Sequence, residues 1–226
     1  MSLIINIDST SGTAVVNIAD NGAVLFEETN AEQNNHAAFL QPAIQKLVKK
    51  TGINIREIDA VAVSHGPGSY TGLRVGMATA KGLCYALGKP LITVSQLEVL
   101  TKDIIDNAGI FEEDMLYCPM IDARRMEVFT ALYDKYLSEA LSPLALILDA
   151  NSFCKFLLKN KVVFFGSGAD KWQQLCKHEN AFFTSIVNKG LALSRLAFEK
   201  FRKNELADLA YAEPLYIKEF YTSTNA

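Results

Sequence analysis

The most distinctive residues of the chain are the glycines of segment 66–76, Gly-Pro-Gly-Ser-Tyr-Thr-Gly-Leu-Arg-Val-Gly. The segment follows an apolar run and precedes a helical pattern, where glycine permits positive φ and the close approach of a ligand or a backbone. A cradle for a phosphate group is the first chemistry that it suggests. However, no Gly-Lys-Ser/Thr follows as in a P-loop, and the acidic residue of the dinucleotide fingerprint is missing. Both departures weaken the phosphate hypothesis.

Small residues continue along the predicted helix in two stripes. Each stripe has its members four residues apart: Gly72, Gly76 and Ala80 in one, and Ala78, Gly82 and Ala86 in the other. Interior glycine destabilises a soluble helix by about 0.5–1 kcal/mol relative to alanine, so close packing should compensate. One stripe can pack on the helix's own sheet, and a second stripe indicates another neighbour. The pattern leaves open both an external helical partner and packing within the core alone.

Three further segments carry groups that could meet an anion. Asp8 stands at the first expected hairpin turn, where a carboxylate can face a phosphate or a metal, although a capped polar turn explains it as well. Gly166 and Gly168 open a helix after a strand, so N–H groups there could receive an anion. Arg124 and Arg125 join two apolar strands, either as a solvated hairpin or as a contact to a partner or to the other lobe. Asp8, Gly166 and Gly168 are therefore weak candidates for binding a cofactor.

Other residue types argue against a catalytic or metal site. The three histidines are not spaced as a metal-binding pair, whereas a metal site needs three or four converging ligands. No nucleophile elbow is present for a serine hydrolase. The four cysteines lie in apolar stretches without a Cys-x-x-Cys pair, which favours buried, reduced thiols and a reducing compartment. We expect no catalytic residue and no metal ligand in this chain.

Composition and charge limit the class of protein. The chain has 226 residues, half of them hydrophobic, which suits one large domain or two small lobes. The formal net charge is −3 and the basic residues are scattered, whereas a protein that grips a nucleic-acid backbone unaided usually has a basic face. We find neither a signal peptide nor an apolar run of membrane-spanning length. These features predict a cytoplasmic protein outside the membrane that meets RNA, if at all, through a partner.

Hydrophobic periodicity predicts an α/β protein with two lobes. The first lobe, residues 1–107, has the order β-β-β-α-β-α-β-α, which gives a mixed five-stranded sheet with helices packed on it. Its expected strands are 3–7, 13–19, 23–29, 58–63 and 91–94, and its expected helices are 35–50, a segment ending near Leu87, and 95–107. The loose stretch 107–114 is the predicted boundary between the lobes.

The second half, residues 108–226, is less regular, and we interpret it as a reduced second lobe of similar construction. Its expected strands are 115–121, 127–133, 144–148 and 162–165; its expected helices are 151–158, one opened by 166–169, and 191–202, before an extended tail at 214–217.

Together these segments resemble the TsaB (YeaZ) family. The similarity follows the family's order over nearly the whole chain, and the glycine loop with its following helix is its most specific part. The matching stretches are 5–10, His36 with Leu40 and Pro42, 58–63, 66–74, 80–83, 121–125, 166–169 and 214–216.

The resemblance implies the two-lobed actin-like/sugar-kinase ATPase fold, with its ribonuclease H-like motif, and a non-catalytic scaffold role. The family supports a larger paralogue, TsaD, which transfers a threonylcarbamoyl group to a tRNA adenosine beside the anticodon, and the ATPase TsaE completes the assembly. The expected partners are therefore TsaD-like and TsaE-like proteins, with tRNA contacted indirectly. No cofactor is expected for the isolated chain, and ATP with Mg²⁺ only in the complex.

In the family, the first two helices of the first lobe pack on the partner's equivalents as a four-helix bundle, and the same surface supports homodimers. One departure is His36-Ala37-Ala38, where the family often has His-Ser-Glu, and this could alter polar contacts at the partner helix. On this view Gly76→Leu would abolish partner binding while the chain still folds. The interface would be formed or bordered by His36, Leu40, Ile44, Leu47, Gly72, Leu73, Gly76 and Ala80.

The alternative is an enzyme, either a free-standing nucleotide phosphohydrolase or kinase of the same fold or a metallopeptidase, since the family was long labelled a glycoprotease. Asp8 and the glycines of 166–168 would then lie beside the phosphates. A third possibility is direct RNA binding, against which the charge argues.

Overall fold

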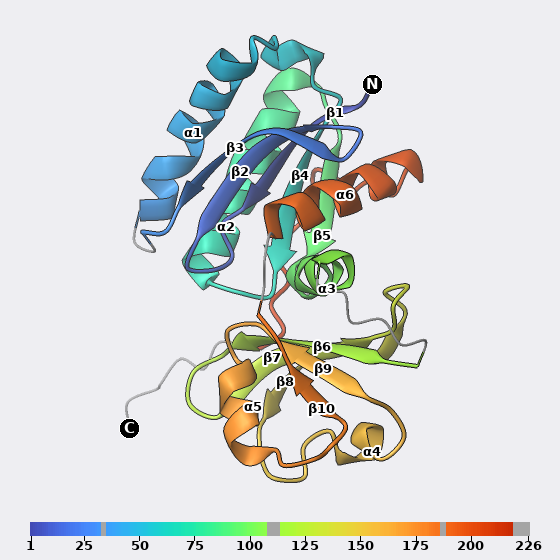
Figure 1. The fold of residues 1–226 in the computed structure, drawn as a ribbon. Coiled ribbons are helices and arrows are strands. Elements are labelled where there is room, and N and C mark those ends of the chain that lie inside the picture. The colour runs from blue at the N-terminus through green and yellow to red at the C-terminus, as the bar shows by residue number, and fades with distance from the viewer. Residues whose placement is uncertain (33–34, 108–113, 186–188, 219–226) are drawn as a thin grey trace, which may run out of the picture.

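The computed structural model describes residues 1–32, 35–107, 114–185 and 189–218 and shows two lobes, each built on a five-stranded sheet (Figure 1). The candidate lobe boundary at 107–114 lies mostly outside the described residues. Within the described residues, no helix is long and apolar enough to cross a membrane.

The first sheet has the mixed topology expected from the sequence. Its strand order is β3-β2-β1-β4-β5, with β1, β2 and β3 antiparallel and β1, β4 and β5 parallel. The hairpin between β2 and β3 turns through Asn21 and Gly22, both at positive φ, as is typical of an Asn-Gly pair. The strands are β1 (Leu3–Asp8), β2 (Ala14–Asp20), β3 (Ala23–Asn30), β4 (Ala60–Gly66) and β5 (Leu91–Ser95).

Helices cover both faces of this sheet (Figure 1). On one face, α1 (His36–Thr51) and α2 (Tyr70–Leu87) bury their apolar sides against β1 and β4. On the other face lie α3 (Gln96–Asn107) and α6 (Lys189–Arg202), and a short 3-10 helix, η2 (Ile55–Glu57), precedes β4. Left-handed glycines, Gly52 and Gly88, end α1 and α2 at the positions where the sequence places their stops.

The second sheet has the order β10-β9-β6-β7-β8 and packs around an aromatic cluster of Phe153, Phe164 and Trp172. The helix expected at 151–158 is shorter than predicted, because Phe153 adopts a left-handed φ of 61° and turns into this cluster. Strand β10 was not predicted. The elements are β6 (Leu116–Asp122), β7 (Glu127–Tyr133), β8 (Glu139–Ile147), α4 (Cys154–Leu157), β9 (Val162–Phe165), α5 (Ala169–Leu175) and β10 (Ala181–Phe183).

The end of the chain returns to the first lobe, which differs from the expected division into 1–107 and 108–226. Leu193 and Leu196 of α6 join the core formed by β1, β4 and β5. Asn17 of β2 donates to the carbonyl of Gly190 at 3.1 Å and accepts from the hydroxyl of Ser194 at 2.9 Å. A helix of the sequence's second half therefore completes the first lobe.

The tail after α6 follows the same lobe towards the cleft between the lobes. Ala207 donates its N–H to Leu91 at 2.8 Å, and Leu215 donates to His65 at 2.7 Å. Lys81 of α2 donates to the carbonyls of Ala210 and Ala212. The segment expected to be an extended tail is thus fixed along α2 and β4.

Leu193→Ala should lower the free energy of unfolding by about 2–5 kcal/mol, since it opens a cavity between α6 and the first sheet. Leu158→Ala is the matched control, because that side chain is 75% exposed, and it should change the free energy by less than about 0.5 kcal/mol. Urea unfolding of the full chain measures both values. Equal, small effects would contradict the packing of α6 described above.

Candidate functional site

The residues predicted as a partner interface lie inside the chain's own core. Leu40, Ile44 and Leu47 of α1 pack with Ala80 of α2 against the first sheet, and Leu73 is buried as well. His36 is also buried, and its Nε2 lies 2.9 Å from the carbonyl oxygen of Ser11. The lobe itself buries these residues, so the statement that they form or border a partner interface stays a prediction: apolar periodicity identifies a buried face and does not distinguish a sheet from a partner.

The structure explains sterically why two positions on the inner side of α2 and one just before it are glycines. A Cβ on Gly72 would lie 1.8 Å from the carbonyl oxygen of Ser9, and one on Gly76 would lie 2.5 Å from the Ser9 hydroxyl. A Cβ on Gly68 would lie 2.3 Å from the carbonyl oxygen of Thr10. We call Gly72, Gly76 and Ala80 the inner stripe, since its glycines leave room for the turn between β1 and β2. Gly76→Leu would therefore disrupt the fold and cannot test partner binding as expected.

Hydrogen bonds fix this turn on the start of α2. The hydroxyl of Ser9 donates to the carbonyl of Gly72 at 2.7 Å, and the N–H of Ser69 donates to the carbonyl of Thr10 at 2.7 Å. The glycine loop is occupied by the chain's own backbone. A phosphate is therefore not needed to explain why Gly68 and Gly72 are glycines.

Asp8 is buried in the same turn and has protein partners. Its Oδ1 accepts from the N–H of Thr10 at 2.9 Å and from the Thr10 hydroxyl at 2.7 Å, and its Oδ2 accepts from Gln96 at 3.2 Å. Gln96 in turn accepts from the hydroxyl of Ser64 at 2.6 Å. This network holds β1, β4 and the start of α3 together, as the capped-turn interpretation of Asp8 predicts.

Gly166 and Gly168 also allow two parts of the backbone to lie close together. A Cβ on Gly166, which has a φ of 98°, would lie 2.4 Å from the carbonyl oxygen of Met120. One on Gly168 would lie 2.6 Å from a methyl group of Val128. The loop between β9 and α5 therefore rests on β6 and β7, and the structure does not bring Gly166 and Gly168 together with Asp8.

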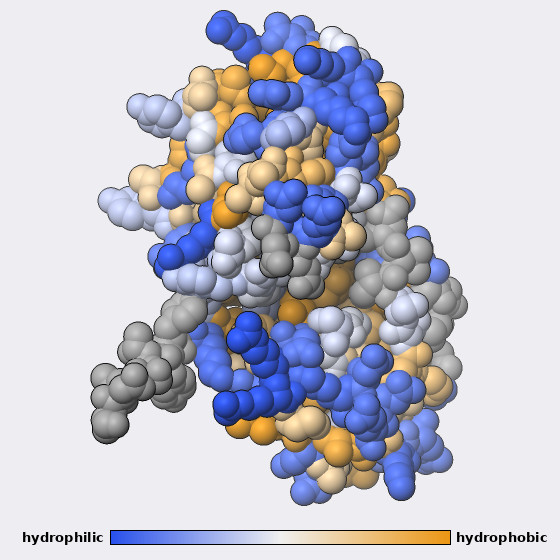
Figure 2. All heavy atoms as spheres, turned by 90° about the vertical axis from the view of Figure 1, so that its left-hand side faces the viewer, coloured by the Kyte–Doolittle hydropathy of each residue, from blue (hydrophilic) through white to orange (hydrophobic). Residues whose placement is uncertain are grey.

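The outer stripe of α2 faces solvent. Ala78, Gly82 and Ala86 are exposed, nothing lies within 4 Å of a Cβ built on Gly82, and Tyr85 beside them is 85% exposed. The neighbouring helix α1 exposes small and polar residues on its outer side (Figure 2, which faces this side of the lobe). We call this surface the α1–α2 face: Ala37, Ala38, Gln41, Gln45, Ala78, Gly82, Tyr85 and Ala86.

A cleft of about 940 Å³ lies between the lobes. The start of α2 with Pro67, Gly68 and Tyr70 forms one wall, and the hairpin from β6 to β7 forms the other. The tail residues 215–218 line it as well. The cleft thus brings the Arg124–Arg125 segment close to the glycine loop, which the sequence alone did not indicate.

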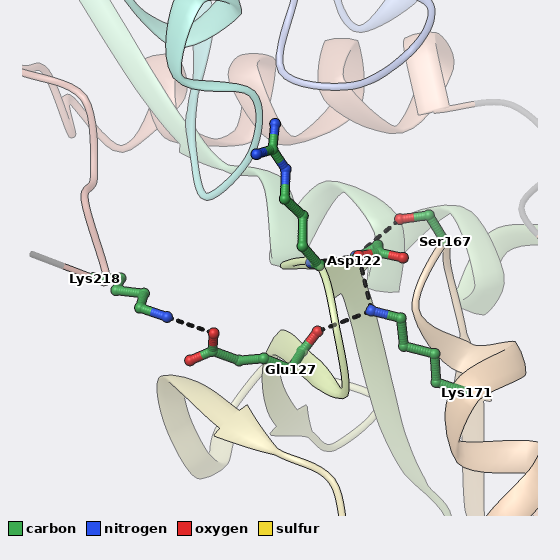
Figure 3. Close-up of polar contacts among 6 residues, drawn as sticks. Asp122, Glu127, Ser167, Lys171 and Lys218 are labelled. Atoms are coloured by element: carbon green, nitrogen blue, oxygen red, sulfur yellow. Dashed lines mark hydrogen bonds and ion pairs between the residues drawn. The ribbon is translucent and has the colours of Figure 1, made fainter. Parts of the chain in front are cut away.

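Ion pairs hold the hairpin in the cleft (Figure 3). Lys171 lies 2.8 Å from Asp122, and Lys218 of the tail lies 2.5 Å from Glu127. Burial would raise the pKa of Asp122, but the Lys171 ammonium and the N–H of Arg124 outweigh it and lower that pKa below its usual range. Asp122 is therefore ionised near neutral pH, and each of the two carboxylates is paired with a lysine.

The described residues include no candidate metal cluster, and the thiols of Cys84 and Cys118 are not activated. Among the described residues, no group of three or more His, Cys, Asp or Glu side chains could hold a metal ion. Burial raises the pKa of the Cys84 thiol to about 11 and that of Cys118 to about 12, so both stay protonated at neutral pH. Cys154 and Cys176 are only partly buried, unlike the expectation for all four.

Comparison with known proteins identifies relatives over most of the chain. Residues 24–212 match the family model TsaD, described as tRNA N6-adenosine threonylcarbamoyltransferase. The tRNA threonylcarbamoyladenosine biosynthesis protein TsaB of Bacillus subtilis (strain 168) is 28% identical over 221 residues, which cover 95% of this chain and 93% of that protein.

Solved structures share the fold. YeaZ from Pseudomonas aeruginosa superposes with a TM-score of 0.78 at 23% identity, covering 96% of this chain and all of that one. The inorganic polyphosphate/ATP-glucomannokinase of Arthrobacter sp. strain KM gives a TM-score of 0.53 at 13% identity, over 90% of this chain and 100% of the kinase chain. These likenesses confirm the predicted actin-like/sugar-kinase architecture.

Gly72→Ala should destabilise the chain by about 1–3 kcal/mol or more, because the new Cβ meets the Ser9 backbone. Gly82→Ala is the matched control on the same helix, and it should stabilise by about 0.5–1 kcal/mol, since its Cβ meets nothing and alanine favours the helix. Thermal and urea unfolding distinguish the two. A stable Gly72→Ala chain would contradict the docking of the β1–β2 turn on α2.

Proposed function

Because this chain belongs to the TsaD family of tRNA N6-adenosine threonylcarbamoyltransferases, on its TsaB (YeaZ) branch, we propose that it is a non-catalytic scaffold subunit of the complex that adds threonylcarbamoyl to tRNA adenosine next to the anticodon. It binds and supports a TsaD-like catalytic subunit. The observation that carries the proposal is the outer stripe of α2, three small residues exposed on a helix whose inner stripe is already used by its own lobe.

Exposed small residues at four-residue spacing favour a helical partner. They let a second helix approach closely, and an exposed aromatic neighbour such as Tyr85 adds apolar area to such a contact. In a monomer these positions have no packing to offset the destabilising effect of an interior glycine at position 82. A partner helix on the α1–α2 face supplies that packing.

The absence of a catalytic role is supported by how the candidate groups are used. Asp8 accepts hydrogen bonds from Thr10 and Gln96, and the glycine loop is filled by the backbone of Ser9 and Thr10. If the chain were a nucleotide-binding enzyme, these groups would be the candidates for contacting a phosphate. The isolated chain therefore requires no cofactor, and ATP with Mg²⁺ acts only in the complex.

The remaining members of the complex follow from the family. A TsaE-like ATPase completes the assembly, tRNA is held mainly through the other subunits, and the α1–α2 face forms a homodimer when the chain is alone. The complex works in the cytoplasm, on tRNA.

Ala78→Arg and Gly82→Arg should abolish co-purification with the TsaD-like paralogue of the same organism, because a long charged side chain prevents close helix contact. Both positions are exposed, so the free energy of unfolding should change by less than about 0.5–1 kcal/mol. The control is Ala150→Arg, an exposed alanine on the second lobe. Unchanged co-purification of the first two variants would rule out the α1–α2 face as the docking surface.

Depletion of the protein tests the function itself. Threonylcarbamoyladenosine in bulk tRNA should fall, and Ala150→Arg but not Gly82→Arg should restore it; nucleoside analysis measures the modification. Normal levels after depletion would exclude the role in tRNA modification. Titration of the isolated chain with ATP and magnesium is an independent check, since tight binding with turnover would indicate an enzyme.

A further inference from the structure

We propose that the cleft between the lobes holds a single-stranded segment of RNA, with Arg124 and Arg125 on its phosphates and the Tyr70–Tyr216 pair beside its bases. The proposal rests on the function proposed above and adds a direct RNA contact that lies apart from the α1–α2 face. It is carried by the backbone of the hairpin, by the balance of charge in the cleft and by the aromatic wall.

In the hairpin between β6 and β7, Arg124 and Arg125 adopt an unfavourable backbone conformation. Ala123 donates its N–H to the carbonyl of Glu127 across the loop at 3.1 Å. Within this loop Arg124 and Arg125 have φ values of 69° and 48°, a region that favours glycine and asparagine. Two consecutive long side chains in this conformation are not the choice that stability favours. Backbone strain of this kind clusters at binding sites.

The carboxylates next to Arg124 and Arg125 form ion pairs with lysines and not with these arginines. Asp122 is paired with Lys171, and Glu127 with Lys218. Across the part of the chain that the structure describes, neither Arg124 nor Arg125 has a carboxylate partner, and both are exposed. The wall of the cleft is thus locally positive on a chain whose net charge is −3. The planar guanidinium presents its donors in a fork that matches the oxygens of a phosphate or a carboxylate.

Aromatic side chains line the opposite wall. Tyr70 and Tyr216 are 37% and 38% exposed, and their ring centroids lie 5.6 Å apart. The guanidinium of Arg74 lies 4.0 Å from the centroid of Tyr70, and its Nε donates to the hydroxyl of Tyr216 at 3.1 Å. Two rings, held in place by Arg74, therefore line the cleft together with the arginine hairpin.

This combination favours a single RNA strand over other occupants. Grooves that bind single strands pair a basic track for the backbone with aromatic rings for the bases. The cleft has a volume near the upper end of small-molecule sites, which are roughly 300–1,000 Å³, and the surface is hollowed between the lobes (Figure 2). The nucleotide next to an anticodon lies in a single-stranded loop, so a complex acting there has such a strand to hold.

The test replaces Arg124 by Asn and Arg125 by Gly together. This pair removes both charges and suits the left-handed backbone, so the variant should unfold at a higher temperature than the natural chain. Binding of cognate tRNA is measured for the full chain in complex with its TsaD-like partner over a series of salt concentrations. Loss of two phosphate contacts to a single strand should reduce the slope of log affinity against log salt by about 1.4.

Two controls make the result specific. Lys155→Gln with Lys159→Gln removes the same charge from exposed positions around α4, on the other side of the second lobe, and should leave the salt slope unchanged (Figure 1). Arg124→Lys with Arg125→Lys keeps the charge and should retain most of the slope. Equal slopes for the Asn-Gly variant and the natural complex would overturn the proposal.

Two further outcomes distinguish binding of a small anion in the cleft from failure of the proposed function. If ATP or inorganic triphosphate binds in an Arg124- and Arg125-dependent way while the tRNA slope is unaffected, the cleft is a small-molecule site and the RNA proposal is wrong. Failure of the natural chain to co-purify with the TsaD-like partner would instead contradict the proposed function. Co-purification with an unchanged slope contradicts only the RNA contact.

Discussion

The structure of the first lobe depends on one close contact, the turn between β1 and β2 against the first two turns of α2. Ser9 and Thr10 approach the helix so closely that the facing positions can only be Gly68, Gly72 and Gly76. The contact joins residues about sixty positions apart and fixes the angle at which α2 crosses the sheet. Because α2 is fixed in this way, its opposite side is held at the surface as a rigid strip of small residues.

The same contact distinguishes this chain from a nucleotide-binding protein with a glycine loop at the same place. In a nucleotide-binding protein, a glycine loop at the end of a strand leaves its N–H groups for a phosphate. In this chain the loop and Asp8 serve the protein's own backbone and side chains. The cleft remains open between the lobes, but its charged side chains come from the second lobe and the tail. A chain can therefore share the fold of a glucomannokinase while its own backbone fills its glycine loop.

Much of the first lobe could be predicted from the sequence, because its signals are local. The Asn-Gly hairpin, the helix periodicity and the glycine stops each depend on a few neighbouring residues. The direction of the two stripes on α2 could not be predicted, since Gly76 and Gly82 look alike until the Ser9 backbone is placed. The position of α6 was missed for a related reason: an amphipathic pattern shows that one side is buried but not what buries it.

The candidate cleft shows the same limit. Arg124 and Arg125 were predicted to form a solvated hairpin or a contact to a partner or to the other lobe, and carboxylates flank them in the sequence. The structure pairs those carboxylates with Lys171 and Lys218, which lie 49 and 91 positions away along the chain. Long-range ion pairs decide which charges remain available, and no spacing rule in the sequence reports them.

The return of α6 to the first sheet has a consequence for synthesis on the ribosome. The face of that sheet formed by Ile4, Ala62 and Val94 is covered by α6, whose last residue is Arg202. At roughly 5–20 residues per second, translation reaches that point several seconds or more after β5 has emerged. During this interval an apolar face is incompletely covered on the nascent chain. The first lobe is therefore first in the sequence but cannot be the first to finish folding.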